Sequence, residues 1–121
     1  MAALAAAGQV ILSLYFLYNG ASHFLRFQAL RGYASAKGVP APGAAVAVSG
    51  LMLLAGGLSL LLEYQVTAGA LLLALFLLPT AFLVHNFWKV EDAAVRANEL
   101  AHFLKNIALA AAVLQLAFLL A

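Results

Sequence analysis

The sequence contains no cysteine and very little charge, and both absences narrow what the chain can be. Without cysteine, disulfides, CxxC redox chemistry, thiolate metal sites and a cysteine nucleophile are all excluded. Only 8% of the 121 residues are charged, whereas soluble domains carry about 25%. The composition is instead 67% hydrophobic, which is more apolar surface than a soluble domain of this length can bury. These numbers predict an integral membrane protein whose main partner is the lipid bilayer.

The few basic residues predict how the chain is oriented. The net charge is +2, but Lys and Arg flank hydrophobic segments and form no solvated patch, so we expect no nucleic-acid partner. Cytoplasmic loops of membrane proteins are enriched in Lys and Arg. We therefore predict a multi-pass protein of the inner (cytoplasmic) membrane with both termini outside. The basic residues lie in or beside two connections on one side: Arg26, Arg31, Lys37, Lys89, Arg96 and Lys105.

Four hydrophobic segments are long enough to cross a bilayer, which takes roughly 20 helical residues. We predict helices at about 2–25, 41–62, 64–88 and 93–121, within one domain that covers 1–121. The second begins at "VPAP" (39–42), because proline is preferred in a first helical turn. The short connection "LLEYQV" (61–66) makes the second and third helices an antiparallel hairpin. The first segment lacks the basic start of a signal peptide, so we expect it to be retained. The predicted fold class is all-α, an integral membrane four-helix bundle.

Each predicted helix has a face of small or polar residues, as expected where membrane helices pack together. On a helical wheel Glu99, His102 and Asn106 fall within about 60° of one another. That stripe continues through Ala110, Val113 and Ala117, and a comparable one in the first helix contains Ala5, Gly8, Leu12, Tyr15, Asn19, Ser22 and His23. In the second helix Gly43, Gly50 and Gly57 recur every seven residues, which predicts another close-contact seam.

The polar residues inside the spans gather at one membrane depth, on the predicted cytoplasmic side. Unpaired polar groups in hydrocarbon cost several kcal/mol, on the order of a lost hydrogen bond or more, so we expect those of the first, third and fourth helices to bond one another. The candidate ligand or proton-transfer cluster is Asn19, His23, His85, Asn86, Trp88, Glu99, His102, Lys105 and Asn106.

Two stretches of the chain resemble the DoxX family of small four-helix bacterial membrane proteins. "FLYNGASHFLRFQALRGYASAKGVPAP" (16–42) resembles the family's first helix and the short helix after it. "FLVHNFWKVEDAAVRANELAHFLKNIAL" (82–109) resembles its third-to-fourth helix connection more closely. The resemblance implies a bacterial inner-membrane protein, and some members are associated with quinone-linked redox systems. It identifies no agreed catalytic residue.

Three interpretations of the polar cluster remain open from the sequence. In the first, the cluster seals one end of the bundle. In the second, it binds a small molecule such as a quinone, and the aromatic walls of the site are Tyr15, Phe87, Trp88 and Phe103. In the third, it binds a metal or haem. The donor set for a metal would be His23, His85, His102 and Glu99, but no HxxxH pair supports it.

The predicted function is a membrane subunit of a quinone-linked oxidoreductase system with redox partner proteins. The alternative is a non-enzymatic assembly or lipid-interacting protein, and the sequence leaves open whether the chain is an enzyme. Gln115 lies opposite the polar stripe of the fourth helix, where a single amide suits an interhelical or subunit contact. A homo-oligomer is therefore a further candidate assembly.

Overall fold

The computed structural model describes residues 2–121 and contains only helices within that range. The elements are α1 (Ala2–Leu25), α2 (Phe27–Ala36), α3 (Pro42–Leu62), α4 (Val66–Leu83), the short 3₁₀ helix η1 (Phe87–Lys89) and α5 (Ala93–Leu120). Four helical spans are long and apolar enough to cross a membrane: Ala2–Leu25, Pro42–Leu62, Val66–Lys89 and Ala93–Leu120. The all-α, four-helix membrane architecture predicted from the sequence is confirmed.

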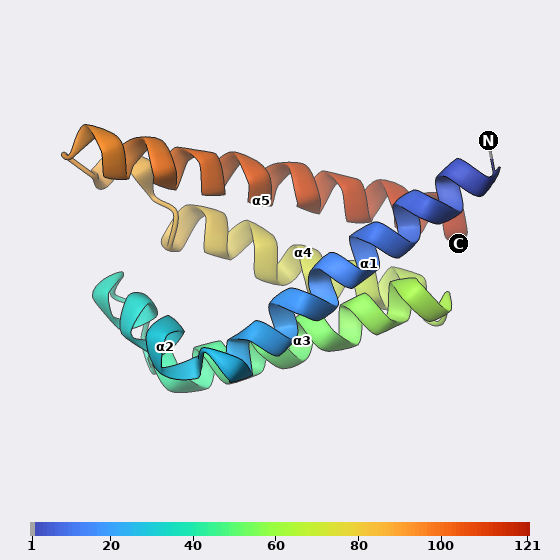
Figure 1. The fold of residues 1–121 in the computed structure, drawn as a ribbon, viewed down its shortest axis with the longest axis horizontal. Coiled ribbons are helices and arrows are strands. Elements are labelled where there is room, and N and C mark those ends of the chain that lie inside the picture. The colour runs from blue at the N-terminus through green and yellow to red at the C-terminus, as the bar shows by residue number, and fades with distance from the viewer. Residues whose placement is uncertain (1) are drawn as a thin grey trace.

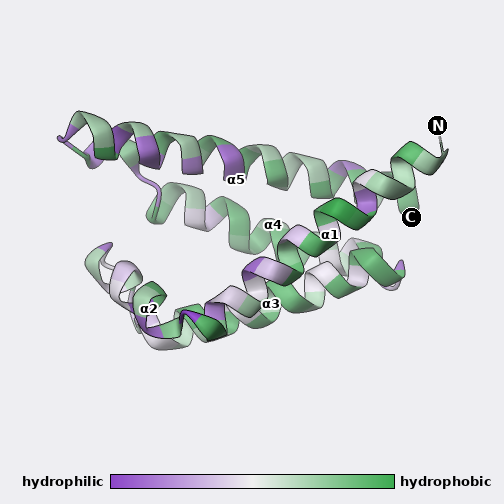
Figure 2. Cartoon of the chain, viewed as in Figure 1, coloured by the Kyte–Doolittle hydropathy of each residue, from purple (hydrophilic) through white to green (hydrophobic). Residues whose placement is uncertain are grey.

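The helices pack in the order α1, α3, α4, α5, and α2 lies against α3 and α1. Figure 1 shows the α1–α3 pair and the α4–α5 pair close together at the end that holds both termini. The two pairs diverge toward the opposite end, which holds α2 and η1 and is called here the α2 end. Hydrophilic residues gather at the α2 end, whereas the rest of the helices are mostly hydrophobic (Figure 2). The diverging pairs leave room inside the bundle at the α2 end.

The core fills the other half of the bundle and joins all four spanning helices. Phe16 of α1, Leu53 and Leu60 of α3, Leu73 of α4 and Val113 of α5 are almost completely buried there. The predicted stripe on α5 is confirmed, because its buried residues are Glu99, Asn106, Ala110, Val113 and Ala117. The core therefore holds the terminal half of the bundle closed while the α2 end stays open inside.

The predicted packing face of α1 needs a correction. The buried residues of α1 are Gln9, Ser13, Phe16, Gly20 and Ser22, whereas Ala5 and Gly8 are exposed. Gln9 explains part of the difference: its Nε2 donates to the Leu60 carbonyl (2.8 Å) and to Glu63 Oε1 (3.1 Å). This bond turns the Gln9 face of α1 toward α3. Tyr15, Asn19 and His23 are then left half-buried on a neighbouring face.

Close backbone approach explains the glycines of α3. A Cβ at Gly50 would lie 2.8 Å from the Phe24 ring of α1, and one at Gly56 would lie 2.5 Å from Leu73 Cγ of α4. In the predicted seam, Gly43 faces Phe27 and Arg31 of α2. Gly50 faces Phe24 and His23 of α1, and Gly57 faces Leu17 of α1. Small residues on α3 thus bring its backbone against α1 on one side and α4 on the other.

The turns follow local chemistry. Between α3 and α4, Glu63 and Gln65 adopt left-handed conformations, and Ser59 Oγ bonds the carbonyls of Tyr64 and Gln65. At the start of α5, the Asp92 side chain accepts from the Val95 N–H (2.9 Å) as an N-cap. These contacts make the tight hairpin that the sequence predicts and set the first turn of α5.

Helix α4 ends at Leu83, earlier than the sequence prediction of residue 88. The Thr80 carbonyl accepts from the N–H groups of both Val84 (2.9 Å) and His85 (3.1 Å), which closes the last turn. His85 and Asn86 therefore lie in the connection to η1. This early end frees His85 to turn toward α5.

Candidate functional site

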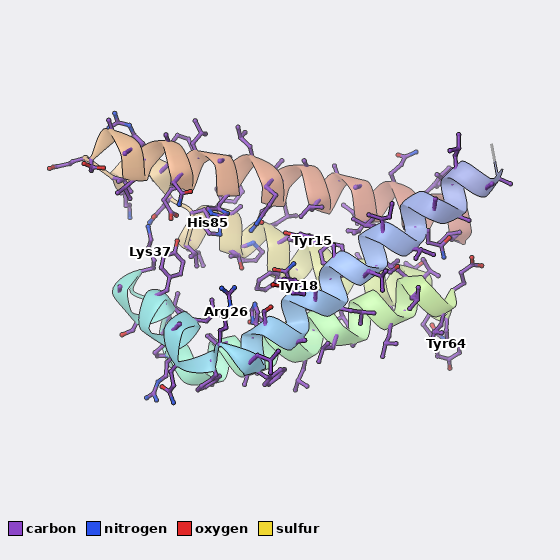
Figure 3. All side chains as sticks on the ribbon, viewed as in Figure 1. Tyr15, Tyr18, Arg26, Lys37, Tyr64 and His85 are labelled. Carbon is purple, nitrogen blue, oxygen red and sulfur yellow. The ribbon has the colours of Figure 1, made fainter. Side chains whose placement is uncertain are left out.

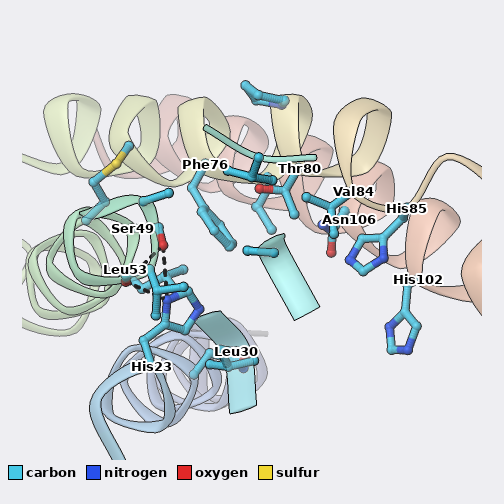
Figure 4. A pocket seen from close by; sticks show the side chains of 18 of the residues that line it. His23, Leu30, Ser49, Leu53, Phe76, Thr80, Val84, His85, His102 and Asn106 are labelled. Atoms are coloured by element: carbon cyan, nitrogen blue, oxygen red, sulfur yellow. Dashed lines mark hydrogen bonds between the residues drawn. The ribbon is translucent and has the colours of Figure 1, made fainter. Parts of the chain in front are cut away.

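A cavity of about 590 Å³ occupies the α2 end, between the diverging helix pairs. Its wall is built from α2 and from those halves of α1, α3, α4 and α5 that lie at the α2 end. Figure 4 shows His23 on one side and His85, His102 and Asn106 on the other. The polar lining residues include Tyr15, Asn19, His23, Tyr33, Ser49, Thr80, His85, Asn98, Glu99, His102, Lys105 and Asn106. Leu30, Val46, Leu53, Phe76 and Val84 supply much of the apolar wall.

Glu99 is the centre of the polar network on the α5 side. The residue is 4% exposed, and both of its carboxylate oxygens accept hydrogen bonds. Oε1 accepts from the Tyr33 hydroxyl at 2.6 Å, and Oε2 accepts from His85 Nδ1–H at 3.0 Å. The ammonium of Lys37 lies 3.5 Å from Oε2. One carboxylate thus joins α2, α5 and the segment after α4.

The network continues along α5 and into the connection before η1. The rings of His85 and His102 stack with their centroids 5.0 Å apart. Lys105 Nζ lies 3.4 Å from His102 Nδ1, so that nitrogen accepts from the ammonium. Lys37 Nζ is also 3.5 Å from Asn86 Oδ1. Figure 3 shows Lys37 and His85 at the same end of the molecule, with Tyr64 at the other end.

Tyr33 lies on α2, outside the membrane spans, and its phenol is strongly held in the protonated form. Burial raises the pKa of Tyr33 above its ordinary value, and the hydrogen bond to Glu99 and the negative charge of that carboxylate raise it further. A protonated phenol is a hydrogen-bond donor, which is the role that Glu99 requires of it. Tyr33 therefore links α2 to α5 as an uncharged hydrogen-bond donor.

His23 is held in a separate arrangement on the α1 side. Its Nδ1 lies 3.0 Å from the Val46 carbonyl oxygen and 3.0 Å from Ser49 Oγ. The Phe76 ring packs edge-on against it with centroids 5.6 Å apart. The sequence predicts that polar groups of the first, third and fourth helices bond one another; Glu99 and His85 do so, whereas His23 of α1 bonds neither of them. Glu99 bonds residues of α2 and of the segment after α4, while His23 bonds α3.

The remaining candidates divide between the cavity and the outer surface. Asn106 lines the cavity and is 4% exposed, and Asn19 lines it while its Nδ2 donates to the Tyr15 carbonyl (2.9 Å). Trp88 is 50% exposed and lies outside the cavity lining. Of the predicted aromatic walls only Tyr15 lines the cavity; Trp88 instead clusters with Phe82, Phe87 and Phe103.

The metal hypothesis finds no support in the geometry. Among residues 2–121, no three His, Cys, Asp or Glu side chains group in a way that could hold a metal ion. His23 is part of the α1 wall, and His85 and Glu99 already bond each other. These side chains form a hydrogen-bonding lining.

Sequence reasoning missed the contribution of α2. Tyr33 is absent from the predicted cluster and Lys37 is predicted only as one of the basic residues of a connection, yet both reach Glu99. They are one helical turn apart, and residues at that spacing share a helix face. That spacing was the available signal. Ser49 and Phe76, which position His23, carried no such signal because each lies within an apolar helix.

Comparison with known proteins identifies the family. The DoxX family model matches residues 4–86, which is more than half of the chain. The matched range contains the 16–42 stretch, His23, Tyr33 and His85, whereas Glu99 and the rest of α5 lie beyond it. No curated protein and no solved structure matches the chain. The four membrane-spanning helices and this match agree: the chain is a small multi-pass membrane protein that belongs to the DoxX family.

Proposed function

We propose that the cavity at the α2 end binds the headgroup of a quinone, and that the protein is the membrane subunit of a quinone-linked redox system in the bacterial inner membrane. Small-molecule sites are typically concave, mostly apolar and about 300–1,000 Å³ in volume, with a few polar groups that orient the ligand. The cavity, at about 590 Å³, has this size and this kind of lining.

The observation that carries the proposal is the state of Asn106. The residue is 4% exposed, and its side-chain amide bonds no other group among residues 2–121; because no fully buried side-chain nitrogen or oxygen there lacks a partner, the amide is open to the cavity. Figure 4 shows Asn106 on the cavity wall near His85. Buried polar groups are normally hydrogen-bonded. An amide that faces a cavity at this depth suits a ligand that brings its own polar atom.

The opposed polar walls favour a quinone over a simple apolar ligand. A quinone and its quinol carry two oxygens on opposite sides of a flat ring, so one oxygen can bond Asn106 or His102 while the other faces His23 on the opposite wall. Phe76 and Leu53 offer apolar surface between those walls. The isoprenoid tail of such a molecule partitions into the bilayer that surrounds the spanning helices.

A matched pair of substitutions on α5 tests this proposal. Asn106→Leu replaces the cavity-facing amide by an apolar side chain with the same number of heavy atoms, and Gln115→Leu likewise removes an amide on the exposed face of that helix. The purified protein in detergent is titrated calorimetrically with short-chain benzoquinones and naphthoquinones, and its extracted lipids are examined for quinone. A lost hydrogen bond of about 0.5–1.5 kcal/mol weakens binding roughly 2- to 13-fold in Asn106→Leu, with no change in Gln115→Leu.

Three results would reject quinone binding at this site. These are the absence of saturable binding by the wild-type protein, equal affinity in both leucine variants, and copurification of phospholipid alone. The last result would support the lipid-interacting alternative. Thermal unfolding of each variant in the same detergent verifies that the bundle is intact before binding is compared.

A further inference from the structure

The hydrogen bonds of His23 determine which of its nitrogens carries the proton. Nδ1 lies 3.0 Å from the Val46 carbonyl oxygen, and a carbonyl oxygen can only accept. Ser49 Oγ donates to that same carbonyl at 3.1 Å, so its own oxygen is also free to accept from Nδ1–H. The Val46 carbonyl therefore requires the proton on Nδ1, and the Ser49 hydroxyl, which donates to that carbonyl, can accept from it. Val46 and Ser49 are positioning residues for this tautomer.

The other ring nitrogen, Nε2, is then a bare acceptor on the cavity wall. Within residues 2–121 no group donates to it, and His23 lines the cavity. Figure 4 shows the ring on the α1 side of the cavity, opposite His85 and Asn106. No carboxylate among residues 2–121 pairs with His23. An unpaired imidazolium inside a membrane bundle is costly, so the ring is neutral and Nε2 keeps its lone pair.

The opposite wall accepts either kind of oxygen. The Asn106 amide offers both a donor and an acceptor. His102 Nδ1 accepts from Lys105, which leaves Nε2–H as a donor. A carbonyl and a hydroxyl can both be bound on this wall. Discrimination between them therefore falls to His23.

We propose that the cavity selects the hydroxyl-bearing, reduced form of its ligand, so that a quinol binds more tightly than the corresponding quinone. This inference rests on the proposed function and assigns its preferred substrate class. A quinol O–H donates to His23 Nε2. A quinone carbonyl at the same place would set an oxygen lone pair against the lone pair of Nε2, and the two repel. One net hydrogen bond is worth about 0.5–1.5 kcal/mol, which is roughly a 2- to 13-fold difference in affinity.

The test separates hydrogen bonding from redox chemistry by using two ligand pairs. Wild-type protein in detergent is titrated anaerobically with a short-chain quinol and its quinone, and separately with a 4-alkylphenol and its methyl ether. We expect the hydroxyl-bearing member of each pair to bind roughly 2- to 13-fold more tightly. His23→Phe removes the acceptor and should abolish that preference. His102→Phe removes an imidazole from the other wall and should retain it.

Each outcome has a distinct consequence. If none of the four ligands binds, the proposed function itself fails. If quinone and quinol, or phenol and ether, bind equally well to the wild type, only the quinol preference is overturned. A preference that survives in His23→Phe, or disappears in His102→Phe, also overturns it. Should His23→Phe not fold, the phenol and ether comparison in the wild type decides the question alone.

Discussion

The Tyr33 hydroxyl donates a 2.6 Å hydrogen bond to Glu99 Oε1 and so connects α2 to α5 at the cavity that both residues line. The two residues are 66 positions apart in the sequence. Helix α2 packs on α3 and α1, and its link to α5 is made by the polar side chains of Tyr33 and Lys37. A single carboxylate therefore links α2, which lines one side of the cavity, to α5.

Tyr33 and Glu99 should be energetically coupled. Tyr33→Phe, Glu99→Gln and the double variant are compared by unfolding in detergent. Residues that share a hydrogen-bond network couple by about 0.5–3 kcal/mol, and we expect a value in that range. The same cycle with Tyr18→Phe, which removes a hydroxyl at a 71% exposed position, should be additive with Glu99→Gln. Additivity in both cycles would mean that α2 is not held by this bond.

The raised pKa of Tyr33 predicts a loss of stability at alkaline pH. The folded chain holds the phenol proton more tightly than the unfolded chain does, because burial and Glu99 raise that pKa. Stability from this group is present below the unfolded-state value of about 10 and is lost as pH rises above it. Thermal midpoints measured from about pH 8 to about pH 11 should fall more steeply in the wild type than in Tyr33→Phe. Tyr18→Phe should follow the wild type; parallel curves for all three proteins would contradict the assignment.

Close packing at Gly56 predicts that an added methyl group is not tolerated there. A Cβ would meet Leu73 Cγ at 2.5 Å and the Gly69 carbonyl oxygen at 3.0 Å. Overpacking of a filled core costs about 1–3 kcal/mol, so Gly56→Ala should lower the thermal midpoint. Gly8→Ala is the control, since nothing lies within 4 Å of a Cβ there. A neutral or stabilising Gly56→Ala would show that α3 and α4 are further apart.

The distribution of Lys and Arg predicts that both termini lie outside the cytoplasm. The two termini lie at the end of the bundle opposite α2 (Figure 1), and the basic residues Arg26, Arg31 and Lys37 lie in or next to α2. C-terminal fusions to alkaline phosphatase and to green fluorescent protein are expressed in a bacterial host. The phosphatase fusion should be active and the fluorescent one dark. The reverse pattern would invert the orientation.

Much of the fold could be predicted because it depends on local properties of the chain. Hydrophobic runs bounded by charges define four spans, and a bilayer leaves helices as the only way to satisfy their backbone groups. The buried stripe from Glu99 to Ala117 followed from helical spacing alone. The face of α1 was predicted less well, because small and polar residues occur on two neighbouring faces. The bond from Gln9 to the Leu60 carbonyl decides between those faces, and it joins residues 51 positions apart.

By itself, the sequence determined the membrane class, the helices and the gathering of polar residues at one depth, since each follows from composition and spacing. Only the tertiary structure decided which of those residues are partners. The early end of α4 turns His85 toward Glu99, and α2 folds back so that Tyr33 and Lys37 reach the same carboxylate. The packing of α1 on α3 places His23 beside Val46 and Ser49, away from Glu99. These hydrogen bonds require groups far apart in the chain to come within about 3 Å of each other. Helical periodicity cannot predict such distances, because it carries no information about how whole helices diverge.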